Sequence, residues 1–139
     1  MINSYIDFHY INIFKHIKHL KIMPLEDALQ EIEGVRVECG SEDWDGYGAA
    51  HISGESYFES IRFLKLIPKN IPYPSMGAEP DGQITLEWYK DRRCCFSVSV
   101  GKEKLAYAGL FGQESEHGEV PFRDEIPKVI LDLISRVYN

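Results

Sequence analysis

Acidic residues are the first candidates for chemistry in this chain. Asp81 and Glu87 lie in the stretch PDGQITLEW, and paired carboxylates can hold a divalent metal ion. A nuclease site built from two carboxylates and a lysine needs that lysine two residues after the second carboxylate. Here Lys90 lies three residues after Glu87, so strand alternation places the two side chains on opposite faces. We therefore expect no metal and no cofactor.

Histidines and cysteines could supply a base or a nucleophile. His51 and His117 lie in predicted turns near acidic residues, yet no serine or cysteine occupies a recognisable nucleophile position. Cys94 and Cys95 are adjacent in a predicted strand, where burial explains them better than catalysis. No catalytic residue is assigned from the sequence.

The stretch SEDWDGYGAA, residues 41–50, sets two aromatic residues among turn-forming ones. Glycine adopts left-handed backbone readily, and an aspartate accepts hydrogen bonds from the backbone two residues on, so Asp45 and its neighbouring glycines predict a turn. On a structural interpretation, Trp44 and Tyr47 anchor this turn on a sheet, which turn chemistry favours. On a functional interpretation, the two aromatic residues are exposed and form a recognition surface, as at interface hot spots.

The net charge of −7 is concentrated in one segment. Residues 24–60 carry ten acidic residues against Arg36 alone, a balance of −9, whereas residues 1–23 carry +2 and residues 61–139 are neutral. Such a segment repels phosphate backbones, so we expect no binding of nucleic acid. A basic protein partner or a cation suits it electrostatically, although many charge runs only face solvent.

Length, hydropathy and cysteine count favour one globular domain in the cytoplasm. The chain has 139 residues, an ordinary domain size, and 44% of them are hydrophobic. It has no apolar run of the roughly 18–20 residues that a membrane span needs, and its start lacks the features of a signal peptide. Three cysteines, two of them adjacent, make a poor disulfide framework. We expect no membrane partner.

Two helices are predicted before residue 41. Residues 5–22 place isoleucine, phenylalanine and tyrosine at helical spacing, which predicts an N-terminal helical extension over residues 1–23. This helix must bury its apolar stripe, so it could pack on a second subunit and form a homodimer. Pro24 starts a second helix, which Gly34 is expected to close.

The later part of the chain predicts a helix, several strands and a last helix. Ser53 can cap a helix whose apolar positions are Tyr57, Phe58, Ile61, Leu64 and Ile67. A proline-rich linker, PKNIPYPSMGAEPDG, follows. Alternation then predicts strands at residues 83–89, 94–100 and about 104–111, and a helical stripe runs from residue 126 to 137.

These elements predict a single α+β domain over residues 24–139, an antiparallel β-meander of at least three strands covered on one face by helices and closed by a C-terminal helix. The face toward the helices should carry Ile84, Leu86, Trp88, Phe96, Val98, Val100, Leu105 and Tyr107. The opposite face should carry Thr85, Glu87, Tyr89, Cys95, Ser97, Ser99, Ala106 and Ala108. That face either meets solvent, as antiparallel sheets allow, or receives a loop, a partner or a small ligand.

Two stretches carry a family resemblance. WDGYGA (residues 44–49) and PDGQITLEW (residues 80–88), followed by FSVSV and LAYAGLF, resemble an uncharacterised family of small bacterial proteins with WDGxGA and PDGxxxLEW patterns. The resemblance covers about residues 41–137. It implies no reaction, cofactor or substrate, because the family has no assigned function. Members often have proline after the alanines, where this chain has His51.

The leading hypothesis is a non-enzymatic cytoplasmic bacterial protein that binds another protein through the acidic segment around WDGYG and the small-sided sheet face. Its candidate binding residues are Trp44, Asp45, Tyr47, Glu87 and Tyr89. The alternative is a small-molecule-binding domain or a hydrolase-like enzyme, in which Glu87, Asp45 and His51 converge on a pocket.

Overall fold

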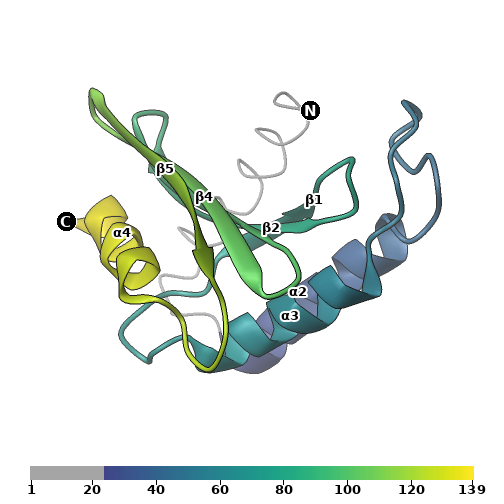
Figure 1. Ribbon diagram of the computed structural model, residues 1–139, viewed down its shortest axis with the longest axis horizontal. Helices are drawn as coiled ribbons and strands as arrows, with labels where there is room; N and C mark the ends of the chain where they lie inside the picture. The colour runs from purple at the N-terminus through teal and green to yellow at the C-terminus, as the bar shows by residue number, and fades with distance from the viewer. Residues whose placement is uncertain (1–23) are drawn as a thin grey trace.

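The computed structural model describes residues 24–139 (Figure 1). The N-terminal helix expected at residues 5–22, with the homodimer it could form, lies outside the described residues. The elements in chain order are α2 (Leu25–Glu38), α3 (Gly54–Leu66), β1 (Ser75–Ala78), β2 (Ile84–Asp91), β3 (Cys94–Val100), β4 (Lys104–Phe111), β5 (Glu114–Pro121) and α4 (Lys128–Tyr138). The predicted α+β class, with a closing C-terminal helix, is confirmed.

The five strands form one antiparallel sheet in the order β1-β2-β3-β4-β5. The predicted meander is therefore confirmed, and it is longer by one strand at each end. β1 (SMGA) lies inside the expected linker, and β5 (ESEHGEVP) is rich in glutamate. Neither segment has a strong strand propensity of its own, so pairing with β2 and β4 is what makes them strands.

Helices α3 and α4 cover the same face of the sheet, and α2 packs beside α3 (Figure 1). Phe63 of α3 meets the ring of Trp88 with centroids 6.2 Å apart. Arg136 of α4 lies over Phe111, its guanidinium carbon 4.4 Å from the ring centroid. The side chains predicted to face the helices are buried in one core, with Tyr107 partly buried at its margin. We call the opposite side of the sheet the second face.

α2 does not end at Gly34, as the sequence predicted, but continues to Glu38. Ile32 and Val35, on either side of the glycine, are both buried in the core. Their packing offsets the roughly 1 kcal/mol that a glycine costs inside a helix. The stretch is therefore helical through tertiary contacts rather than through local propensity.

The cap of α3 is confirmed, but its buried stripe is shifted. The Ser53 hydroxyl accepts a hydrogen bond from the amide of Ser56 at 3.0 Å. Phe58, expected in the core, is 68% exposed, while Ser60 and Phe63 are buried in its place. The stripe includes serines, so a search for apolar residues alone misplaces it.

None of the described helices combines the length and apolar character that crossing a bilayer requires.

Candidate functional site

The connection between α2 and α3, residues 40–53, contains the WDGYG motif and projects beyond the ends of both helices (Figure 1). We call it the WDGYG loop. At its base the amide of Ile52 donates to the carbonyl of Cys39 at 3.1 Å. Higher up, the amide of Asp43 donates to the carbonyl of Ala49 at 2.7 Å. These cross-links fix the path of the loop although it has no regular secondary structure.

Both aspartates of the loop bind its backbone with their carboxylates. Asp45 Oδ1 accepts from the amides of Tyr47 at 2.8 Å and Ala49 at 3.1 Å. Asp43 Oδ1 accepts from the amide of Gly48 at 2.5 Å. The predicted aspartate turn is confirmed, and Gly46 and Gly48 have φ values of +77° and +84°. The Asp45 carboxylate therefore has a structural role in the loop, and this role comes ahead of any role in binding a ligand.

The two aromatic residues of the motif have opposite environments. Trp44 is half-buried against the core, and its indole nitrogen donates to the carbonyl of Ala50 at 2.9 Å. Tyr47 is 93% exposed. The expected anchoring role therefore fits Trp44 and is wrong for Tyr47, which the loop holds out toward solvent.

The WDGYG loop rests on the PDG turn that precedes β2. The amide of Ala50 donates to the carbonyl of Pro80 at 2.8 Å, and the amide of Ser53 donates to the carbonyl of Gly82 at 2.9 Å. Gly82 has φ of +93°, and a Cβ there would lie 2.8 Å from the carbonyl oxygen of His51. The WDGYGA and PDGQITLEW stretches thus meet in space, which their separation in the chain does not reveal.

His51 is hydrogen-bonded to an acidic side chain at the surface. Its Nδ1 lies in hydrogen-bond contact with Glu42 Oε1, and this contact lowers the pKa of Glu42. Asp45 is occupied within the loop, and Glu87 lies on the second face of the sheet. Within residues 24–139, no group of three or more histidine, cysteine, aspartate or glutamate side chains is arranged to hold a metal ion.

Glu87 and Tyr89 of β2 form a separate group from the loop residues. Both project from the second face, where Glu87 pairs with Ser97 and Tyr89 with Cys95 in the strand register. Glu87 is 7% exposed, and burial raises the pKa of the half-buried Tyr89. The loop docks on Gly82, before the strand begins, whereas Glu87 lies about 10 Å along β2 from its first residue, Ile84, at about 3.3 Å per residue. The five candidate binding residues therefore occupy two places.

Beside the loop, α2 and α3 carry a polar network that the sequence did not predict. Tyr57 Oη donates to Glu33 Oε2 at 2.6 Å, and Arg36 Nε donates to the same oxygen at 2.9 Å. These hydrogen bonds lower the pKa of Glu33 to about 2, and the bond from Arg36 has the larger effect. Val37 and Phe58 are neighbours of this network in sequence and are 67% and 68% exposed. The Phe58 ring packs edge to face on the Tyr57 ring, with centroids 5.5 Å apart, and presents its remaining surface to solvent.

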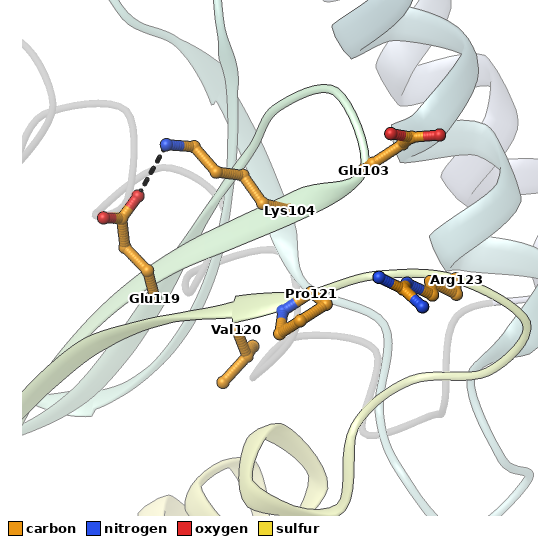
Figure 2. Close-up of a pocket in the computed structure, with 6 residues that line it drawn as sticks. All are labelled: Glu103, Lys104, Glu119, Val120, Pro121 and Arg123. Atoms are coloured by element: carbon orange, nitrogen blue, oxygen red, sulfur yellow. Dashed lines mark ion pairs between the residues drawn. The ribbon is translucent and has the colours of Figure 1, made fainter.

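A shallow depression of about 490 Å³ lies where β4 begins and β5 ends (Figure 2). It is lined by Glu103, Lys104, Glu119, Val120, Pro121 and Arg123. Lys104 Nζ pairs with Glu119 Oε2 at 2.8 Å across the two strands. The remaining charges, Glu103 and Arg123, have opposite signs, so the depression selects no ligand charge. None of the candidate binding residues lines it.

Comparisons with known proteins give no match to a family model, to a curated protein or to a solved structure. The family resemblance of the WDGYGA and PDGQITLEW stretches therefore stays a prediction.

Proposed function

We propose that this chain is a non-enzymatic, cytoplasmic bacterial protein that binds a basic protein partner through the WDGYG loop and the adjoining surface of α2 and α3. The observation that carries the proposal is the exposure of Tyr47, 93%, on a loop whose backbone is cross-linked by hydrogen bonds. Tyrosine is enriched among the residues that dominate interface energetics. An exposed tyrosine on a fixed loop is suited to such a contact.

The fixed backbone matters because ordering a loop on binding costs affinity. Asp43 and Asp45 each accept backbone amides of the loop, and Trp44 fastens it to Ala50. The loop therefore does not have to be ordered when a partner docks, which lowers the entropic cost of association. The ring of Tyr47 does not hold the loop together in this way, so it is available for contact with a partner.

The surroundings of the loop favour a basic partner. The segment with a charge of −9, residues 24–60, comprises α2, the WDGYG loop and the first half of α3. Clustered charge of one sign speeds the encounter with a partner of the other sign. Val37 and Phe58 add exposed apolar area on the two helices.

The free thiols of Cys39, Cys94 and Cys95 support a reducing compartment.

The alternative of a ligand-binding or hydrolase-like pocket has less support. It needs Asp45, His51 and Glu87 to converge. Asp45 Oδ1 accepts two loop amides, and His51 pairs with Glu42. Glu87 belongs to the second face. We therefore leave Glu87 and Tyr89 out of the proposed contact surface.

The proposal is tested by capture from a bacterial extract with the full chain as bait. A partner should be retained by the wild-type chain, and Tyr47→Ala should weaken its binding about thirtyfold, corresponding to the loss of a hot spot of about 2 kcal/mol. Binding should also weaken as salt is raised, because charge guides the encounter. The affinity is then measured by titration calorimetry with the purified partner.

Tyr138→Ala is the control, since Tyr138 is a half-exposed tyrosine on a different element, at the end of α4. It should leave binding unchanged. Retention that is the same for wild type and Tyr47→Ala, or the absence of any retained protein, contradicts the proposal. Circular dichroism of Tyr47→Ala should match wild type, because the ring is outside the core.

A further inference from the structure

An exposed aromatic cluster joins α2 to α3. The ring of Phe58 lies against the ring of Tyr57, and the guanidinium carbon of Arg36 lies 5.7 Å from the centroid of that same tyrosine ring. Val37 follows Arg36 in α2. We call these four residues, Arg36, Val37, Tyr57 and Phe58, the Phe58 platform.

The platform exposes apolar surface that the core does not use. Val37 and Phe58 are 67% and 68% exposed, and within residues 24–139 only Tyr47 is a more exposed large hydrophobic side chain. Two such side chains on neighbouring helices gain hydrophobic free energy when another molecule covers them. This surface is therefore suited to an apolar contact with a partner.

The side chains at the centre of the platform are fixed before anything binds. Glu33 Oε2 accepts from Tyr57 Oη at 2.6 Å and from Arg36 Nε at 2.9 Å, and Glu33 Oε1 accepts from Arg36 Nη2 at 2.5 Å. One carboxylate thus holds both side chains, which lowers the entropic cost of docking on them. Arg36 also balances the charge of Glu33, so the centre of the platform has no net charge.

The rim of the platform is acidic. Glu38 follows Val37, and Glu55 lies one helical turn before Phe58; both are exposed, and Glu55 has only a loose contact of 3.8 Å with Lys102. An apolar centre with an acidic rim fits a partner whose apolar residues are flanked by lysine or arginine. A second copy of this chain fits poorly, because two segments with a charge of −9 would face each other.

The backbone decides which element of a partner suits this surface. The platform presents side chains of two helices and no sheet edge. An extended segment would lay its amide and carbonyl groups on apolar side chains, where they lack hydrogen-bond partners. A helix satisfies its own backbone groups and presents apolar side chains along one face. A helix is therefore the better occupant.

We propose that the Phe58 platform binds the apolar face of a basic amphipathic helix in the partner. Val37 and Phe58 contact the apolar stripe of that helix, and Glu38 and Glu55 meet its lysines or arginines. The inference rests on the proposed function, because it names the element of the basic partner that docks beside the WDGYG loop.

Titration calorimetry with the full chain and two synthetic peptides tests the proposal. The probe is a peptide of leucine and lysine, about four helical turns long, with leucine at helical spacing. The comparison peptide has the same composition but alternates leucine and lysine, which gives no apolar helix face. The full chain should bind the probe at least about tenfold more tightly than the comparison peptide. Equal binding would mean that charge alone attracts the peptides, and it would overturn the proposal.

Phe58→Ser should weaken binding of the probe about thirtyfold, because the substitution removes the central apolar contact. Val129→Ser is the control, since Val129 is an exposed aliphatic residue on α4, and it should leave the affinity unchanged. Circular dichroism should show that both variants keep the fold, because both side chains lie outside the core. Equal affinities of the two variants would overturn the proposal.

The acidic rim is tested by removing charge. Glu38→Gln with Glu55→Gln should weaken binding of the probe about fivefold at low salt, because the rim no longer attracts its lysines. Glu103→Gln with Glu125→Gln removes the same charge from exposed positions near β4 and α4 and should have little effect. Equal weakening by the two double variants would assign the attraction to net charge and contradict the proposal.

The purified partner separates this inference from the proposed function. If Tyr47→Ala weakens its binding and Phe58→Ser does not, the platform is not its docking site, while the proposed function stands. If both variants weaken binding, the partner uses the loop and the platform together. If neither does, both proposals fail.

Discussion

Two buried serines of α3 show how much the same side chain can differ in its contribution to the stability of the fold. The Ser56 hydroxyl donates to the carbonyl of Val100 at 2.7 Å and accepts from the amide of Ile84 at 2.7 Å, joining α3 to β2 and β3. The Ser60 hydroxyl, one turn later, is buried without a hydrogen-bond partner among the described residues. The first hydroxyl satisfies two backbone groups of the sheet, and the second satisfies none.

We expect Ser56→Ala to lower the free energy of unfolding by about 2–3 kcal/mol, because it leaves a buried carbonyl and a buried amide without their partner. Ser60→Ala, the matched control, should change it by less than about 0.5 kcal/mol or raise it, since it removes an unsatisfied hydroxyl and alanine favours helix. Urea denaturation of the two variants measures both values. Equal losses in the two variants would contradict this account.

Local hydrogen bonds could be predicted at the residue scale, and distant ones could not. The Asp45 turn and the Ser53 cap follow from side chains that reach the backbone two or three residues away. The bridge from Ser56 to Val100 spans 44 residues, and no local pattern encodes it. The sequence left open whether Tyr47 is an anchor or an exposed recognition residue, because its solvent exposure depends on how the whole loop is placed.

At the scale of the elements, the contact between the WDGYG loop and the PDG turn depends on a glycine. Gly82 has positive φ, and a side chain there would press on the carbonyl of His51. We expect Gly82→Ala to destabilise the chain by about 1–3 kcal/mol, through backbone strain and this clash. Thermal denaturation measures the loss, and faster hydrogen exchange at Ala50 and Ser53 would locate it in the loop contact.

Gly34→Ala is the control substitution for this prediction. Gly34 lies within α2, and a Cβ there would meet no atom within 4 Å. Alanine should stabilise this helix by about 0.5–1 kcal/mol. If both glycine substitutions stabilise the protein, the close approach of the loop to the PDG turn is not a constraint.

Strands with strong alternation were predictable, and the two edge strands were not. β2 and β3 alternate large apolar with small or polar residues, a period that local reading detects. β1 has four residues and no β-branched side chain, and β5 buries little of its surface. β1 precedes β2 and β5 follows β4, each across a short turn, so the neighbouring strand provides the template that their sequences lack.

At the scale of the whole molecule, an open antiparallel sheet must protect its edges. β5 pairs with β4, and in the described part of the chain no strand pairs with its other side. The strand carries Glu114, Glu116 and Glu119 and ends at Pro121. Charged residues and proline on an edge strand discourage pairing with another molecule. The glutamates therefore contribute to keeping the chain from associating edge to edge.

We expect Glu116→Val with Glu119→Val to cause self-association that grows with protein concentration, because the edge becomes an apolar strand without repulsion. Analytical ultracentrifugation over a range of concentrations measures it. Glu26→Val with Glu55→Val removes the same charge from helices α2 and α3 and is the control. Association of both double variants to the same extent would attribute the effect to net charge instead of the edge.

The order of the strands has a consequence for how the chain folds as it leaves the ribosome. Every strand after β1 pairs with the one made just before it, so each new hairpin can close over a few residues at low entropic cost. Helix α3, made before the sheet, covers part of the apolar side of β2 and β3, but the apolar side of β4 has to wait for α4, which follows the strands in the chain. Until then this part of the nascent sheet carries an uncovered hydrophobic flank, which makes α4 decisive for its escape from chaperones and proteases.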